Sequence, residues 1–225
     1  MKNFYLLLIA LFIGFNSQSQ AIYKTIDSYK LEGKRELKIQ LPRNYNPEEK
    51  RSYPLIIVLD GDYLFEPVAG NIDYQSYWED IPDCIVVGIN QADTRIDDFY
   101  YDNHSNLPLH SGADFYEFMA AELLPFIEDN YNASNFRIVV GHDLSANFIN
   151  YYLFKDDPIF RAYVALSPDF APEMINRLKQ RLSILEKEVF YYMATGDADI
   201  KAIRASILES NAMISTIENK NFLYK

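Results

Sequence analysis

The sequence has 225 residues, of which 49% are hydrophobic, 15% aromatic and 24% charged, and its formal net charge is −11. So many apolar side chains exclude a disordered chain, and the length suits one α/β domain with a sizeable core. The acidic excess repels phosphate backbones, which argues against nucleic acid as a partner. With one cysteine and three histidines, we expect no intramolecular disulfide, no metal site and no cofactor.

The first 20 residues have the pattern of an export signal. A basic residue precedes an apolar run over residues 4–15, and small residues two apart follow that run. The run is shorter than the roughly 20 residues that a membrane-spanning helix needs. We therefore expect residues 1–19 to be a signal peptide cleaved near Ser19/Gln20. Residues 20–225 would then be one domain, exported to the periplasm or the exterior, without a stable membrane span.

Short apolar runs alternate with helical patterns along the rest of the chain. An edge-type strand is expected at the alternating residues 31–41. Strands buried on both faces are expected at the continuous apolar runs 55–59, 85–89, 136–140, 162–166 and 189–193, and a last strand at 221–225. Helices are expected over 115–131, 144–154, 172–185 and 200–211. This alternation predicts a mostly parallel sheet with helices on both faces, and a cleft built by the irregular stretch 90–112 at the carboxyl ends of the strands.

The turn after the run 136–140 has the spacing of a nucleophile elbow. The sequence GHDLS over residues 141–145 leads from a buried strand into a helix and has small residues at its two ends. In the G-x-S-x-G form of this turn, small residues let the strand and helix approach, and the strained central residue is a nucleophilic serine. Here Asp143 takes the central position, and Ser145 replaces the second glycine. We expect Ser145 to face into the helix, which argues against its acting as a displaced nucleophile.

Together with four further segments, this turn resembles the putative-esterase family of the α/β-hydrolase fold, which includes esterase-D-like and siderophore-esterase-like enzymes. Residues 118–131 (FMAAELLPFIEDNY) are similar to the family's helix before the elbow strand, and residues 59–62 (LDGD) to its oxyanion-side turn. Residues 89–98 and 156–168 resemble its next loop and its P-x-x-F…S-P segment. The resemblance runs from residue 29 to the end. It implies a three-layer α/β-hydrolase fold and a secreted carboxylic-ester hydrolase that takes a small ester or acyl ligand.

The resemblance also implies a serine-hydrolase site. In such a site a serine attacks the ester carbonyl, a histidine takes the proton, an acid orients the histidine and two backbone N–H groups hold the oxyanion. The acid position falls on Asp199, with Asp197 next. An equally open interpretation is that both aspartates cap the helix that follows them. The oxyanion donors would be the backbone amides of Leu144 and of Asp62 or Tyr63.

Two parts of that site are missing from the sequence. The nucleophile position holds Asp143, and no histidine follows His142. We expect His142 to point toward the core, and His104 and His110 to be surface residues of the irregular loop. We expect that the chain reaches the last strand of the fold but lacks the family's C-terminal segment, which would leave that strand without a following helix.

Three interpretations of Asp143 stay open. In the first, Asp143 is a covalent nucleophile, although its ester would need a histidine-activated water for release. In the second, the chain has lost catalysis and its cleft binds a ligand or partner. In the third, the chain is a fragment of a longer hydrolase whose tail carries the histidine. We expect an ester hydrolase that is impaired or inactive as given, a pseudoenzyme candidate, with a non-catalytic binding module as the alternative.

Overall fold

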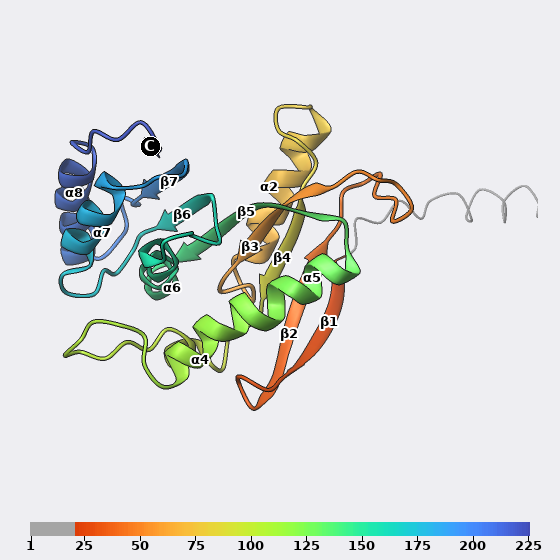
Figure 1. Ribbon diagram of the computed structural model, residues 1–225, viewed down its shortest axis with the longest axis horizontal. Helices are drawn as coiled ribbons and strands as arrows, with labels where there is room; N and C mark the ends of the chain where they lie inside the picture. The colour runs from red at the N-terminus through yellow and green to blue at the C-terminus, as the bar shows by residue number, and fades with distance from the viewer. Residues whose placement is uncertain (1–20) are drawn as a thin grey trace, which may run out of the picture.

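The central feature of the fold is a sheet of eight strands in the order β1-β2-β4-β3-β5-β6-β7-β8 (Figure 1). The computed structural model describes residues 21–225, so the predicted signal peptide lies outside the described residues. β1 and β2 are antiparallel, as are β2 and β4, and the other neighbouring pairs are parallel. The strands are β1 (Ile22–Ser28), β2 (Gly33–Gln40), β3 (Tyr53–Val58), β4 (Ile85–Ile89), β5 (Ala133–His142), β6 (Ala162–Leu166), β7 (Val189–Ala194) and β8 (Phe222–Tyr224). The mostly parallel sheet confirms the predicted α/β class.

The central strands form where the sequence is apolar on both faces. All five residues of β4 are buried, as expected for a parallel strand covered on both sides. The bounds of β4 and β6 agree residue for residue with the predicted runs. β2 instead alternates buried and more exposed residues. Its predicted edge position is wrong, because β1 pairs with its outer side.

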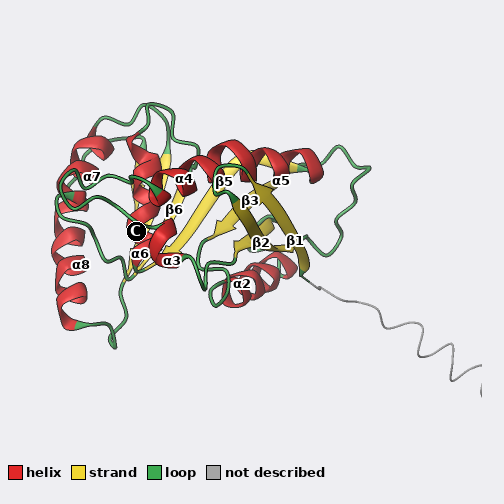
Figure 2. Ribbon diagram, turned by 90° about the horizontal axis from the view of Figure 1, so that it is seen from below, coloured by secondary structure: helices red, strands yellow, loops and turns green. Residues whose placement is uncertain are grey.

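Helices pack on both faces of the sheet. On one face, Phe65 and Ala69 of α2 (Phe65–Tyr77) join a core cluster with residues of β3 and β4. A larger cluster fills the opposite face, where Figure 2 shows α4 and α5 lying across the sheet from α2. The helices that contribute to the larger cluster are α4 (Ser111–Phe118), α5 (Leu124–Asn130), α6 (Leu144–Phe148), α7 (Met174–Ser183) and α8 (Lys201–Ile214).

The predicted helices are present but differ in their ends and regularity. The helix expected over 115–131 begins at Ser111 and contains a π-helical turn over Met119–Leu123 between α4 and α5. The helix expected over 144–154 is α6 followed by a 3-10 turn over Ile149–Phe154. Three elements lie outside the predictions: β1, α2 and the four-residue helix α3 (Arg95–Asp98) inside the irregular stretch. α3 brings polar side chains to the carboxyl ends of the strands.

Candidate active site

β5 and α6 meet in a tight turn at Asp143. The backbone of Asp143 has φ 59° and ψ −116°, a conformation that a non-glycine residue keeps only when its surroundings impose it. A Cβ atom on Gly141 would lie 2.7 Å from the carbonyl carbon of Ser145. Glycine is therefore required where the strand and helix approach each other. Residues 141–145 have the strand-turn-helix geometry that their sequence predicts, with Asp143 at the apex.

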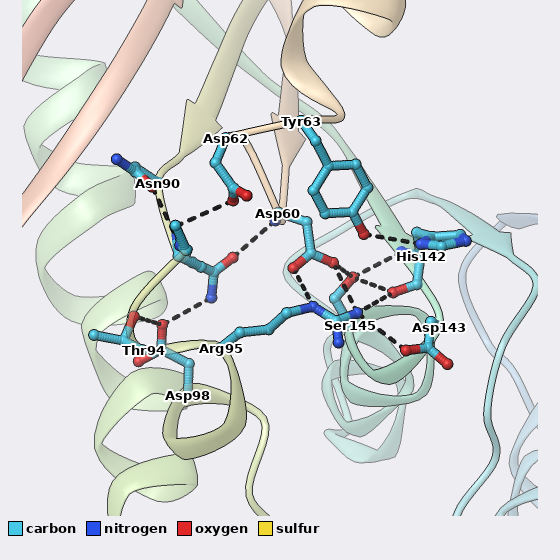
Figure 3. A network of polar contacts seen from close by, with 12 residues as sticks. Asp60, Asp62, Tyr63, Asn90, Thr94, Arg95, Asp98, His142, Asp143 and Ser145 are labelled. Carbon is cyan, nitrogen blue, oxygen red and sulfur yellow. Dashed lines mark hydrogen bonds and ion pairs between the residues drawn. The ribbon is translucent and has the colours of Figure 1, made fainter.

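The carboxylate of Asp143 is paired with Arg95 of α3 (Figure 3). Arg95 Nη2 lies 3.2 Å from Asp143 Oδ2 and 3.0 Å from the carbonyl oxygen of His142. Its Nε donates to Oδ1 of Asp60 at 2.7 Å. The Asp60 side chain is 0% exposed, whereas that of Asp143 is 32% exposed. One guanidinium is thus shared by a buried and a half-exposed carboxylate, and the buried one makes the shorter contact.

Ser145 connects the elbow to the same buried carboxylate. Its hydroxyl lies 2.7 Å from Asp60 Oδ2, to which it donates, and accepts the backbone N–H of His142 at 2.7 Å. The residue is 0% exposed. Because both hydrogen bonds are internal and the hydroxyl is shielded from solvent, Ser145 braces the turn. It faces inward, as its sequence position predicts.

A buried polar network extends from Asp60 behind the elbow. The Asp60 N–H donates to Gln91 Oε1 at 2.9 Å, and Gln91 Nε2 donates to Asp98 Oδ2 at 2.8 Å. Asp98 pairs in turn with Arg35 Nη2 of β2 at 2.8 Å. Each buried carboxylate therefore has a cation and further hydrogen bonds that compensate its lost hydration. Sequence reasoning did not assign roles to Asp60 and Arg95, although both lie in segments that resemble the family, because nothing in the sequence indicates that these two side chains pair.

The candidate oxyanion donors differ in their availability. Leu144 is the first residue of α6, so its amide has no intrahelical acceptor. The amide of Tyr63 donates to the carbonyl oxygen of Asp60 at 3.2 Å. The Tyr63 amide therefore already has an acceptor within its own turn. This favours the amide of Asp62 as the second oxyanion donor. The oxyanion role of Leu144 and Asp62 stays a prediction.

Asp199 lies in the turn after β7 and is held by three donors. Its Oδ2 accepts hydrogen bonds from Ser167 Oγ at 2.6 Å, Thr195 Oγ1 at 2.7 Å and the Gly196 N–H at 2.8 Å. These hydrogen bonds, that from Ser167 foremost, lower the pKa of Asp199. The residue is therefore a fixed carboxylate at the carboxyl end of β7, where the acid of a hydrolase site is expected. Its catalytic role stays a prediction.

Asp197 has different surroundings. Its side chain is 96% exposed and pairs with Arg204 Nη2 at 2.7 Å on the surface. The N-cap residue of α8 is Ile200, and no side chain caps this helix. The interpretation that Asp197 and Asp199 are helix caps is therefore wrong. Of the two, Asp199 has the environment that an acid position needs.

The histidines are not arranged around Asp143. His142 Nδ1 lies 2.8 Å from the hydroxyl of Tyr63, which is 45% exposed. The expectation that His142 points toward the core is wrong, because His142 ends β5 and its side chain emerges beyond the sheet beside the turn that precedes α2. Burial and the charge of Asp60 raise the pKa of the Tyr63 phenol. His104 and His110 are exposed, as expected.

A further carboxylate stands next to the elbow. The amide of Asp169, which follows β6, donates to the carbonyl oxygen of Asp143 at 3.3 Å. Burial and the charge of Asp143 raise the pKa of Asp169. Within residues 21–225, no group of three or more histidine, cysteine or acidic residues is arranged to hold a metal ion. In the same part of the chain, no helix is long and apolar enough to cross a membrane.

Comparison with known proteins gives a family and several similar structures. Residues 28–222 match the family model described as Putative esterase, whereas no curated protein matches the chain. An uncharacterised protein from Capnocytophaga ochracea DSM 7271 is 29% identical with a TM-score of 0.83, over 92% of this chain and 57% of that one. This chain therefore spans little more than half of that protein.

Two further structures share the fold at lower identity. The BES protein from Bacillus cereus is 21% identical with a TM-score of 0.78, over 92% of this chain and 86% of that chain. An IroE-like serine hydrolase from Shewanella oneidensis is 22% identical with a TM-score of 0.73, over 91% and 72%. The strand order, the elbow at Asp143 and the match over residues 28–222 lead to one conclusion: the chain belongs to the Putative esterase family, with an α/β-hydrolase fold.

Proposed function

We propose that the site around Asp143 binds a carboxylic ester or an acyl ligand, and that the 225-residue chain hydrolyses simple esters poorly or not at all. Membership of an esterase family supports the ligand class. The observation that carries the impairment is the ion pair between Asp143 Oδ2 and Arg95 Nη2 at 3.2 Å. A serine at the apex would present a hydroxyl to the substrate, whereas this carboxylate is engaged by a guanidinium.

The chemistry of a carboxylate at the elbow also supports impairment. Attack of Asp143 on an ester carbonyl would form a mixed anhydride, which is higher in energy than the starting ester. The departing alkoxide would in addition need a proton from a general acid. Replacing serine by aspartate therefore does not preserve acyl transfer, even though the backbone of the elbow is retained.

The positions of the histidines support the same proposal. His142 is hydrogen-bonded to Tyr63 through Nδ1. Among residues 21–225, no histidine is hydrogen-bonded to the Asp143 carboxylate. General-base catalysis contributes about a hundredfold or more to such reactions. A site without it can bind a ligand but does not turn it over.

Hydrolysis of p-nitrophenyl acetate tests the proposed impairment. We expect the purified chain and its Asp143→Ala variant to hydrolyse the ester at the same rate, close to that of buffer. Asp197→Ala, which removes an exposed carboxylate near the site, is the matched control. Turnover at least about a hundredfold above buffer that is lost in Asp143→Ala and kept in Asp197→Ala would show that Asp143 is catalytic.

Ligand binding is tested by thermal shift with a panel of carboxylic esters and free carboxylic acids. A ligand that binds the folded chain raises its melting temperature in a concentration-dependent way. We expect the bound ester to be recovered chemically unchanged, and the shift to decrease in Asp143→Ala. A panel member that is consumed during the measurement contradicts the impairment. The absence of any shift across the panel contradicts the ligand class.

Export is a further part of the proposal. A leader over residues 1–19 and a single mature domain over 20–225 are supported by the apolar run at the N-terminus. They are also supported by the start of β1 at Ile22, because cleavage near Ser19/Gln20 would leave that strand whole.

A further inference from the structure

The helix that carries Arg95 is too short to hold its own orientation. α3 has four residues, and no side chain in the described part of the chain caps its N-terminus. Isolated helices of fewer than about 12 residues are only marginally stable in water. Contacts outside the helix must therefore determine how α3 presents Arg95 to the elbow. Arg95 is the first residue of α3 and Asp98 the last, and both make ion pairs with other segments.

Asp98 attaches α3 to β2. Its carboxylate is 4% exposed and lies 2.8 Å from Nη2 of Arg35, whose side chain is 8% exposed. The other carboxylate oxygen accepts hydrogen bonds from Gln91 Nε2 and Thr94 Oγ1, each at 2.8 Å. Arg35 also donates to Thr94 Oγ1 through Nη1. One buried guanidinium thereby holds both the residue before α3 and the last residue of α3.

Polar contacts continue from Asp98 to Arg95 by a second route. Gln91 donates to Asp98 and accepts the N–H of Asp60 at 2.9 Å through Oε1. Asp60 Oδ1 in turn accepts a hydrogen bond from Arg95 Nε at 2.7 Å. The helix backbone from Arg95 to Asp98 closes this series of contacts into a ring (Figure 3). Neither end of α3 can therefore shift without breaking a contact at the other.

The two arginines also rest on neighbouring aromatic rings. The guanidinium carbon of Arg95 lies 5.9 Å from the ring centroid of Phe99, and that of Arg35 lies 5.8 Å from the ring centroid of Phe115. The two rings are edge to face, with centroids 5.8 Å apart, and both belong to the larger core cluster. Arg35 and Arg95 thus share a support in the core, in addition to the polar ring.

We propose that Asp98 and Arg35 are positioning residues for the elbow, because their buried ion pair holds α3 in the orientation in which Arg95 binds Asp143. Arg95 Nη2 lies 3.2 Å from Asp143 Oδ2, and this contact depends on the orientation of α3. Asp98 and Arg35 therefore act on the apex carboxylate through Arg95. Because Asp143 is the carboxylate expected to meet the ligand, the positioning role rests on the proposed function.

Chemical labelling of Asp143 in the full chain tests this role. A water-soluble carbodiimide with glycine ethyl ester converts accessible carboxyl groups to amides, and peptide mass spectrometry gives the labelling rate of each aspartate. We expect Asp98→Asn to raise the labelling rate of Asp143 toward the rate in Arg95→Met, in which the partner of Asp143 is removed. Arg35→Lys should raise it as well, because lysine keeps the charge but lacks the fork that reaches both Thr94 and Asp98.

Ile207→Ala is the matched control for loss of stability. Ile207 is 2% exposed in α8, so its truncation destabilises the chain outside the polar ring. It should leave the labelling rate of Asp143 unchanged, and the exposed Asp197 should be labelled at the same rate in every variant. Circular dichroism shows which variants are folded. Because removing one partner of a buried ion pair is strongly destabilising, the milder Arg35→Lys decides the outcome if Asp98→Asn does not fold.

The outcomes separate the positioning role from the ligand class, because the labelling uses no ligand. An unchanged labelling rate of Asp143 in the folded Asp98→Asn and Arg35→Lys chains overturns the positioning role and leaves the ligand class standing. An equal rise in Ile207→Ala overturns it too, since any loss of stability would then free Asp143. The absence of a thermal shift with the ester panel contradicts the ligand class and leaves the labelling result valid.

Discussion

At the scale of single residues, chemically identical carboxylates acquire different properties from the groups they contact. Asp60 is fully buried and is held by Arg95 and Ser145. Asp143 shares the same arginine but stays half-exposed. Asp199 instead accepts three hydrogen bonds from neutral donors. The residue type alone therefore says little about the role of each aspartate. Its surroundings make Asp60 a buried structural carboxylate, Asp143 the partner of an arginine and Asp199 an anion fixed by neutral donors.

The hydrogen bonds to Asp199 predict a pH-dependent contribution to stability. Its pKa is lowered from the ordinary 3.8, so the folded state favours the ionised form. The resulting stabilisation is fully present above that ordinary pKa and is lost as the pH falls through the lowered value. We expect Asp199→Asn to reduce the free energy of unfolding at neutral pH, with a difference from wild type that shrinks in acid. Urea denaturation at a series of pH values measures this.

Asp197→Asn is the control for that experiment. Asp197 makes an exposed ion pair, which contributes little to stability at any pH. Equal losses of stability in Asp199→Asn and Asp197→Asn at neutral pH, or a loss in Asp199→Asn that persists unchanged in acid, would contradict the assigned role of the three hydrogen bonds.

At the scale of elements, the contact between β5 and α6 depends on one glycine. A Cβ atom on Gly141 would lie 2.7 Å from the Ser145 carbonyl carbon and oxygen and 2.8 Å from the Ala146 nitrogen. These are backbone atoms that cannot rotate away. We expect Gly141→Ala to destabilise the fold by about 2 kcal/mol or more, because the strand and helix must separate. Urea denaturation gives the free energy of unfolding.

Gly70 is the matched control for this substitution. It lies inside α2, and a Cβ atom there would meet no atom within 4 Å. Alanine is favoured over glycine in helices, so we expect Gly70→Ala to stabilise the chain by about 0.5–1 kcal/mol. If the two variants changed stability in the same direction, the close approach at Gly141 would not be the cause.

The helices and strands that could be predicted are those whose burial gives a clear apolar pattern in neighbouring residues. β4 and β6 are continuous apolar runs, and their bounds agree with prediction. β1 has a single fully buried residue, Ser28, and α2 has only Phe65 and Ala69. Elements that bury so few residues leave a weak periodic pattern, which explains why the predictions above do not include them.

At the scale of the whole molecule, the sheet brings distant segments to one edge. Asp60 follows β3, Arg95 follows β4, Asp143 follows β5 and Asp199 follows β7. Because the carboxyl ends of parallel strands meet at the same edge, these turns are neighbours in space. The general place of the site is therefore readable from the order of the strands, once a parallel sheet is inferred.

The proposed export of the whole molecule gives a prediction. If residues 1–19 are a leader, the mature chain begins at Gln20, two residues before β1. We expect intact-mass analysis of the chain expressed in a secreting bacterial host to find that species in the periplasm or medium. Replacing Leu8 with Arg in the apolar run should keep the uncleaved chain in the cytoplasm. Recovery of the chain beginning at Met1 from the exported fraction would contradict cleavage.

By itself, the sequence determined the α/β class, the positions of the buried strands, the elbow at residues 141–145 and the aspartate at its apex. Each of these features can be inferred from residues close together in the chain, because burial and turn geometry impose local sequence patterns. Only the tertiary structure decided that Arg95 binds Asp143, that Ser145 braces Asp60 and that His142 faces Tyr63. These features depend on which loops and faces meet, and contacts between residues far apart in the chain leave no periodic trace in one sequence.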